Sequence, residues 1–143
     1  MKENTHIGVY GVVEQDGKVL MIKKTRGAYK GQYDLPGGGI KFRESIEDAL
    51  RREFMEEVGV EIETIKALEN SCKTSIWNNN ADDVETHHIG MYYRVTIKPG
   101  QAVKTEPDGH DSAGCEWIEK DQLTDTPVAS ILIPILALIQ CTK

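Results

Sequence analysis

Three glutamates lie close together in one segment of the sequence, since Glu53, Glu56 and Glu57 stand at positions i, i+3 and i+4. On a helix this spacing places the carboxylates on one face, within an arc of about 100°. Like charges placed in this way repel one another unless a counter-charge offsets them. Mg²⁺ offsets them because it is a hard cation that prefers carboxylate oxygen, and Mn²⁺ accepts the same ligands. The spacing therefore predicts a divalent-metal site on a helix.

The residues around the glutamates predict the helix that must position them. Ser45 suits the N-cap, and Asp48 follows three residues later in a near capping box. Gly59 stands where the C′ residue that ends a helix is expected. Between these ends an apolar stripe recurs every four residues, at Ile46, Leu50, Phe54 and Val58. We therefore expect an amphipathic helix whose apolar stripe packs against a core.

The same stretch resembles the Nudix box, G-x5-E-x7-R-E-U-x-E-E-x-G-U, in which U is a bulky apolar residue. Its defined positions are filled by Gly38, Glu44, Arg52, Glu53, Phe54, Glu56, Glu57, Gly59 and Val60. The family more often has an aliphatic residue where this chain has Phe54. A solvated acidic helix is the alternative interpretation, but it does not explain the glycines, the first glutamate and the arginine together. The chain is thus similar to the Nudix hydrolases.

The resemblance implies a hydrolase that depends on Mg²⁺ or Mn²⁺ and cleaves a nucleoside diphosphate linked to another group. Glu53 and Glu57 would be inner-sphere metal ligands, and Glu56 would bind the metal directly or through water. Arg52 would orient the glutamates by pairing with Glu44, because a guanidinium holds a carboxylate in a fixed fork.

The resemblance leaves two candidates for the general base. Some family members use a glutamate of the box, which here is Glu53. Others use an acidic residue on the loop before the last strand. Asp111 is the first candidate there, six residues before Trp117, with Glu106 and Asp108 behind it. The alternative for Asp111 is an ordinary solvated loop residue.

Basic residues and glycines are the candidates for substrate binding. An expected strand over 19–24 ends in Lys23 and Lys24, and Arg26 follows soon after. These cations would contact a phosphate or a base, or they are ordinary exposed lysines at the edge of a sheet. Gly37 and Gly38 belong to a Leu-Pro-Gly-Gly sequence that the family also shows at this place. Their backbone would approach the ligand closely, and a carbonyl there often adds a metal ligand in the family.

The markers that separate Nudix subfamilies point to a minimal, MutT-like enzyme. The proline of ADP-ribose enzymes and the tyrosine of dinucleoside polyphosphate enzymes are replaced here by Ser75, Ile76 and their neighbours. The hypothesis is release of pyrophosphate from a (deoxy)nucleoside triphosphate, an oxidised one included. The alternatives are an ADP-ribose or nucleotide-sugar pyrophosphatase and, in another class, a non-catalytic nucleotide-binding module. Trp77, Tyr33 and Tyr10 are candidates to stack on a base or to pack in the core.

Composition limits the class of protein. The chain has 143 residues, so we expect one Nudix hydrolase domain over 1–143. Its net charge is −6, so we expect it to bind neither a nucleic-acid polymer nor an anionic membrane. Three cysteines without metal-ligand spacing predict reduced thiols in a cytoplasmic protein. The sequence leaves open whether the protein is a monomer or a homodimer. The apolar run over 131–139 is too short to cross a bilayer.

The remaining elements follow from hydrophobic periodicity and turn signals. Asp16 and Gly17 mark a hairpin, and a polar loop is expected over 99–112. His87 and His88 would point to opposite faces of one strand, as ordinary strand histidines. We predict strands over 5–14, 19–24, 40–42, 60–76 in one or two pieces, 85–97 and 114–119, and a helix over 127–140 kinked or started near Pro134. The resemblance adds the architecture, an α/β/α sandwich with a central mixed β-sheet.

Overall fold

The structure is a computed structural model that describes residues 1–107 and 112–140. Its first sheet has four strands in the order β5 (Gly37–Gly39), β1 (Lys2–Val12), β7 (Asp83–Ile97) and β6 (Ile62–Asn78). Strands β1 and β7 are parallel and the other two pairs are antiparallel, so this sheet is mixed. In the second sheet β3 (Lys18–Lys24) pairs antiparallel with β2 (Glu14–Gln15), β4 (Tyr33–Asp34) and β8 (Ser112–Glu119).

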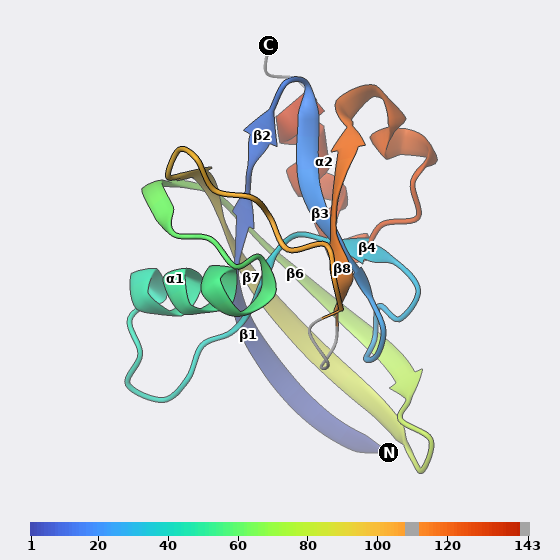
Figure 1. The fold of residues 1–143 in the computed structure, drawn as a ribbon. Coiled ribbons are helices and arrows are strands. Elements are labelled where there is room, and N and C mark those ends of the chain that lie inside the picture. The colour runs from blue at the N-terminus through green and yellow to red at the C-terminus, as the bar shows by residue number, and fades with distance from the viewer. Residues whose placement is uncertain (108–111, 141–143) are drawn as a thin grey trace.

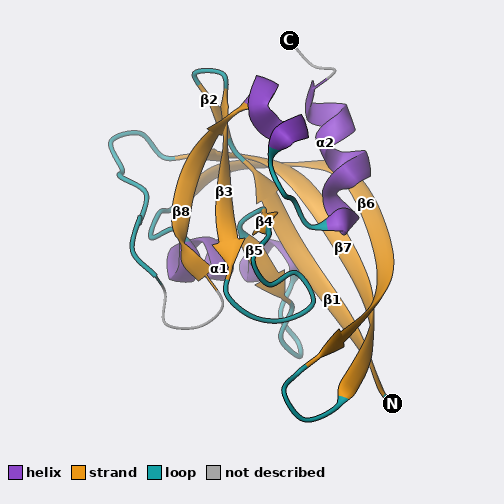
Figure 2. Ribbon diagram, turned by 90° about the vertical axis from the view of Figure 1, so that its right-hand side faces the viewer, coloured by secondary structure: helices purple, strands orange, loops and turns teal. Residues whose placement is uncertain are grey.

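Helices cover the strands on two sides, as Figures 1 and 2 show for α1 (Ile46–Glu57) and α2 (Ile133–Gln140). Along β1 the adjacent Val9 and Tyr10 belong to different hydrophobic clusters, and so do Leu20 and Met21 along β3. Successive side chains of a strand point to opposite faces, so each strand contributes to two cores. One cluster contains the buried residues of α1 and the other those of α2. The predicted α/β fold with a mixed sheet is confirmed.

Both predicted ends of α1 are confirmed. The Ser45 hydroxyl accepts a hydrogen bond from the backbone N–H of Asp48 at 3.1 Å. At the other end Gly59 has a φ of 75°, and its N–H donates to the carbonyl of Phe54 at 2.9 Å. This left-handed conformation strains any residue with a Cβ, so glycine stops the helix there.

The apolar stripe of α1 is confirmed for three of its four positions. Leu50, Phe54 and Val58 are fully buried, whereas Ile46 is 39% exposed. The prediction is wrong for Ile46 because it is the first residue of the helix, before the turn that packs on the sheets. The side chain of Phe54 lies so close to Gly11 that a Cβ there would be 2.6 Å from its ring.

One predicted element is misplaced in the sequence, and another is shorter than its predicted range. No strand forms over 40–42; the strand is β5, three residues earlier, where Gly37–Gly39 pair with β1. A Cβ on Gly37 would collide with the carbonyl of Val9, so only glycine allows this approach. The helix predicted over 127–140, kinked or started near Pro134, is α2; its start near Pro134 is confirmed, and a 3₁₀ turn, Ser130–Leu132, precedes it. Residues 127–129 are extended instead, because their backbone hydrogen-bonds with Tyr33 of β4.

Three further features complete the comparison with the predicted elements. The Asp16–Gly17 hairpin turn is confirmed, with positive φ at both residues. The segment after α1 is one long strand, β6, with irregular register near Ala67. A 3₁₀ helix over Lys120–Asp125 was not predicted. Among the described helices, none has the length and apolar character needed to cross a membrane.

Candidate active site

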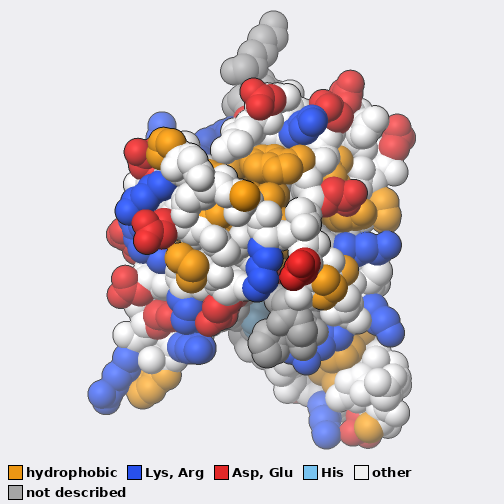
Figure 3. Space-filling view, viewed as in Figure 1, with side chains coloured by type: hydrophobic (Ala, Val, Ile, Leu, Met, Phe, Trp, Pro, Cys, Tyr) orange, Lys and Arg blue, Asp and Glu red, His pale blue; other side chains and the backbone are white. Residues whose placement is uncertain are grey.

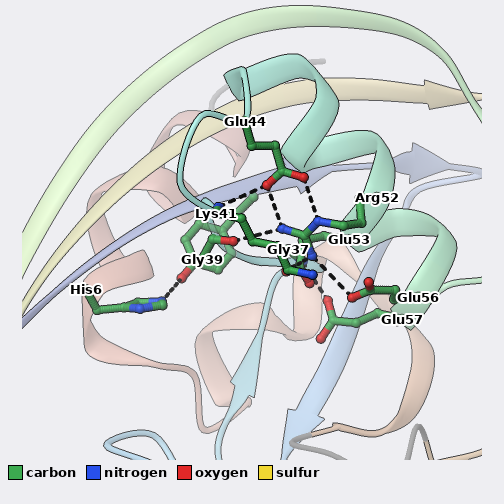
Figure 4. Close-up of polar contacts among 10 residues, drawn as sticks. His6, Gly37, Gly39, Lys41, Glu44, Arg52, Glu53, Glu56 and Glu57 are labelled. Atoms are coloured by element: carbon green, nitrogen blue, oxygen red, sulfur yellow. Dashed lines mark hydrogen bonds and ion pairs between the residues drawn. The ribbon is translucent and has the colours of Figure 1, made fainter.

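Arg52 is the centre of a charged network on α1 (Figure 4). Its Nε and Nη2 atoms donate to the two oxygens of Glu44 at 2.7 and 2.8 Å, which is the predicted pairing. Its Nη1 atom donates to Glu53 at 2.9 Å and to Glu56 at 3.3 Å. Nη2 also donates to the carbonyl of Gly39 at 3.0 Å. One guanidinium therefore orients three carboxylates and ties the helix to β5.

This network keeps Glu44 and Arg52 charged. The hydrogen bonds from Arg52 and then from the backbone N–H of Lys41 lower the pKa of Glu44 to about 2. The bonds to Glu44 in turn raise the pKa of the Arg52 guanidinium. Glu44 is therefore a carboxylate throughout the range in which most enzymes work, and it holds Arg52 in place. Around α1, acidic and basic side chains lie side by side on the surface (Figure 3).

Two of the glutamates lie against the glycines of β5. The backbone N–H of Gly37 donates to a carboxylate oxygen of Glu57 at 2.7 Å, and Glu57 is only 4% exposed. A Cβ at Gly38 would lie 2.7 Å from the carboxylate of Glu53. A side chain at position 38 would therefore displace Glu53. Consecutive glycines thus bring two carboxylates of α1 to one place on the backbone.

A cavity of about 500 Å³ lies beside the same glycines. Tyr10 lines it, and the Tyr10 ring would be 2.8 Å from a Cβ at Gly37. His6 also lines it and would be 3.1 Å from a Cβ at Gly39. Among its lining residues are Asn4, Lys24, Arg26, Tyr29, Asp34, Ser75, Trp77, Thr86 and His88. The glutamates and two lining residues of the cavity therefore lie against the same strand, β5.

This arrangement, glutamates on a capped helix beside a glycine turn, agrees with comparison to known proteins. The NUDIX domain family matches residues 2–139 of the chain. The chain belongs to the NUDIX family. The predicted class, a hydrolase of phosphoric anhydride bonds, is confirmed with it.

Two relatives and one solved structure show what the chain is similar to. An ADP-ribose pyrophosphatase from Methanocaldococcus jannaschii is 28% identical over 117 residues, which are 82% of this chain but only 63% of that protein. Nucleoside triphosphatase NudI from Escherichia coli is 29% identical over 116 residues, 78% of this chain and 80% of NudI. A MutT NUDIX hydrolase from Burkholderia pseudomallei superposes with a TM-score of 0.74 at 26% identity, covering 97% of this chain and 99% of that one.

The carboxylates of this NUDIX chain suit a hard divalent cation by their chemistry. Glu53, Glu56 and Glu57 offer only oxygen donors, which Mg²⁺ and Mn²⁺ prefer. Within residues 1–107 and 112–140, no three His, Cys, Asp or Glu side chains are already gathered as metal ligands. Each glutamate instead accepts a hydrogen bond, two of them from Arg52 and Glu57 from Gly37. Their assignment as ligands stays a prediction, and it requires rotation of side chains that share one helical face.

The predicted substrate-binding cations of this NUDIX domain fall in two places. Lys24 and Arg26 line the cavity. Lys23 points away from it and lies 6.0 Å from the centre of the Tyr33 ring, because neighbours on a strand face opposite ways. Of the aromatic candidates, Tyr10 and Trp77 line the cavity and Tyr33 does not. Glu106 is exposed, while Asp108 and Asp111 lie outside the described residues.

His88 and Tyr29 are residues whose part in this NUDIX cavity the sequence did not reveal. His88 is 5% exposed, and its two ring nitrogens lie 2.8 Å from the Tyr10 hydroxyl and 3.0 Å from the Tyr29 hydroxyl. Burial, and then the nearby His6 and Lys24, lower the pKa of His88 to about 4, so its imidazole is neutral near pH 7. His87 is exposed on the opposite face, as predicted. The available signal was a short one, the sequence His-Ile-Gly-x-Tyr, which occurs at 6–10 and again at 88–92.

Proposed function

We propose that this NUDIX hydrolase converts a (deoxy)nucleoside triphosphate, an oxidised one included, to the monophosphate and pyrophosphate, with Mg²⁺ or Mn²⁺ as cofactor. One observation carries the proposal: Glu53 and Glu57 meet at Gly37 and Gly38, and Tyr10, whose ring lies against Gly37, lines a cavity of about 500 Å³. A cavity of this size is in the usual range for a small ligand. The diphosphate would lie over the glycine turn and the nucleoside would occupy the cavity.

Glu53, Glu56 and Glu57 would hold the metal, in keeping with their all-oxygen donor set. When bound, the ion supplies charge that offsets the diphosphate, polarises a phosphoryl oxygen and lowers the pKa of a bound water. Arg52 holds Glu53 and Glu56 through one nitrogen, and its bonds to Glu44 and to the carbonyl of Gly39 anchor it to β5.

Lys24 and Arg26 line the cavity and would meet negative charge on the substrate. This matters in a chain whose net charge is −6, because the surface as a whole repels a nucleotide. The general base would take a proton from the attacking water at hydrogen-bond distance. Glu53 is the candidate among the described residues, and Asp111 is the candidate outside them.

A second function, hydrolysis of ADP-ribose or a nucleotide sugar, is favoured by one specific finding. The relative that is 28% identical over 117 residues carries the name ADP-ribose pyrophosphatase. The two functions differ in their products. Cleavage of ADP-ribose gives two monophosphates, whereas the proposed reaction gives one monophosphate and pyrophosphate.

The decisive experiment is a substrate panel with product analysis. Purified protein with Mg²⁺ would be incubated separately with nucleoside triphosphates, ADP-ribose and nucleotide sugars, and pyrophosphate and monophosphates would be measured. We expect pyrophosphate from at least one triphosphate and none after chelation of the metal. If no triphosphate releases pyrophosphate, the proposed function is wrong; two monophosphates from ADP-ribose would establish the second function.

A further inference from the structure

The cavity extends along the first sheet for more than the length of a nucleoside. On β1 the side chains of Asn4, His6 and Tyr10 all line it. Tyr10 lies against Gly37 of β5, and Asn4 stands six positions earlier on the same strand. At about 3.3 Å per residue these two positions are about 20 Å apart. A nucleoside spans about eight covalent bonds and is about 10 Å long. A nucleoside next to β5 therefore leaves part of the cavity for a further group.

The loop between β3 and β4 brings positive charge to the cavity. Three cations of this loop line the cavity: Lys24, Arg26 and Lys30. A backbone hydrogen bond closes the loop, since the N–H of Gly31 donates to the carbonyl of Lys24 at 2.9 Å. The buried Tyr29 ties the loop to β7, because its hydroxyl lies 3.0 Å from His88 Nδ1. The cations are therefore carried by a loop whose backbone is held against the sheet.

The point at which this loop is anchored lies about one nucleoside length from the glycines of β5. His88 is opposite His6 in the register of β1 and β7, and His6 stands four positions before Tyr10. Tyr10 is opposite Gly37 in the register of β1 and β5. Four residues of a strand span about 13 Å. When a diphosphate lies over β5, the loop therefore meets the far side of the nucleoside rather than the diphosphate.

Positive charge is in excess in this cavity, although the chain as a whole carries a net charge of −6. The lining contains the three cations and one carboxylate, Asp34, which is an excess of two positive charges with the histidines counted as neutral. Within residues 1–107 and 112–140, neither Arg26 nor Lys30 pairs with an acidic side chain. The metal at the glutamates would offset the diphosphate, and a nucleoside is neutral. The excess therefore indicates a further anion in the cavity.

We propose that the cavity binds a second phosphate of the substrate, a phosphomonoester on the 2′ or 3′ oxygen of the ribose, through Arg26 and Lys30. The proposal rests on the proposed function, in which the cavity holds the nucleoside. A phosphomonoester carries a charge of about −1.5 to −2 near pH 7, which matches the excess of two positive charges in the lining. Arg26 suits this ligand because a guanidinium donates to two phosphate oxygens at once.

Titration calorimetry tests the proposal without turnover. The wild-type protein with Mg²⁺ would be titrated with the 5′-monophosphates of the four common ribonucleosides and with their 2′,5′- and 3′,5′-bisphosphates. For at least one nucleoside we expect a bisphosphate to bind about tenfold or more tightly than the monophosphate, because hydrogen bonds between charged groups are the strong ones. The better bisphosphate identifies the ribose oxygen. Dissociation constants within about threefold of the monophosphate for every bisphosphate, or no measurable binding of any, would overturn the proposal.

Arg26→Gln and Lys30→Gln assign the second phosphate to the loop. Each variant removes one positive charge from an exposed side chain, so the fold should survive, as circular dichroism would verify. The affinity advantage of the bisphosphate should fall to about threefold or less in each variant. Lys66→Gln is the matched control, because it removes the same charge from an exposed position of β6 outside the cavity. Its advantage should equal that of the wild type. An unchanged advantage in both loop variants, or an equal fall in Lys66→Gln, would overturn the proposal.

Failure of the proposed reaction and failure of the second phosphate site give different results. If no triphosphate releases pyrophosphate but a bisphosphate keeps its advantage in binding, the reaction is wrong and the phosphate site stands. If pyrophosphate is released but no bisphosphate binds more tightly than its monophosphate, the phosphate site is wrong and the reaction stands.

Discussion

The protein contains two polar networks that meet at β5 and differ in kind. Around Arg52 the network is charged, and one guanidinium holds Glu44, Glu53 and Glu56. Around His88 the network is neutral, and it is built from imidazoles and hydroxyls. A charged network fixes the direction of every hydrogen bond, since guanidinium only donates and carboxylate only accepts. A neutral network leaves direction open. The first therefore suits holding a reaction geometry, and the second suits adapting to a ligand.

We expect the largest effect on turnover from a change to a carboxylate of α1. Glu57→Gln removes one negative charge but keeps an oxygen that accepts the bond from Gly37, so the fold should survive. We expect turnover to fall by about a hundredfold or more, because the charge stabilisation that a metal ion supplies is worth several kcal/mol. Steady-state pyrophosphate release measures it.

Glu47→Gln is the control for that variant, since Glu47 is an exposed acid in the first turn of the same helix and pairs with Arg51. Its turnover should match the wild type. Near-normal activity in Glu57→Gln would exclude Glu57 as a metal ligand and weaken the contrast between the two networks.

The next largest effect tests the forked hydrogen bonding of the Arg52 guanidinium. Arg52→Lys keeps the positive charge but cannot bond Glu44, Glu53 and Gly39 together. We expect a loss of about 1–3 kcal/mol in the free energy of unfolding and a lower turnover. Urea denaturation gives the first quantity. Arg51→Lys changes the exposed neighbouring residue and should lower the free energy of unfolding by about 0.5 kcal/mol or less. Equal losses at both positions would show that Arg52 acts only as a surface charge.

The sequence made one network predictable and concealed the other. Glu53, Glu56 and Glu57 lie within one stretch of helix, so their spacing along the chain is also their spacing in space. His88 and Tyr10 are 78 residues apart, and only the parallel pairing of β1 with β7 brings them together. Pairing of distant strands is not encoded in local periodicity. The glycine strand β5 was misplaced for a related reason, because glycines carry no periodic signal and Gly37–Gly39 form a strand only through contact with β1.

A smaller effect compares two stacked tyrosines, one inside the neutral network and one outside it. The hydroxyl of Tyr10 bonds His88, whereas the buried hydroxyl of Tyr92, 5.2 Å away between ring centres, has no hydrogen-bond partner among the described residues. Tyr10→Phe should destabilise the fold by about 1–2 kcal/mol, because His88 Nε2 loses its partner. Tyr92→Phe should be neutral or stabilising by up to about 1 kcal/mol. Equal losses in urea denaturation would mean that the Tyr10 bond contributes nothing.

The smallest predicted effect is a difference in the pH range over which each network loses its contribution to stability. The folded pKa of His88 is about 4 and lies below its ordinary value of 6.5. As the pH is lowered, the unfolded chain therefore binds a proton at His88 before the folded protein does. The stability that neutral His88 contributes is complete above pH 6.5 and declines as the pH falls towards 4. Glu44 has a folded pKa of about 2 against an ordinary 4.5, so its contribution is complete above pH 4.5 and is lost towards pH 2.

Urea midpoints measured across pH 7, 5 and 3 separate these two windows. His88→Phe should flatten the decline between pH 7 and 5, where the neutral network titrates, and leave the steeper loss below pH 4.5. Glu44→Gln should do the opposite, since it removes only the group whose pKa is held down by Arg52. If His88→Phe loses stability between pH 7 and 5 as steeply as the wild type, a group other than His88 controls that window.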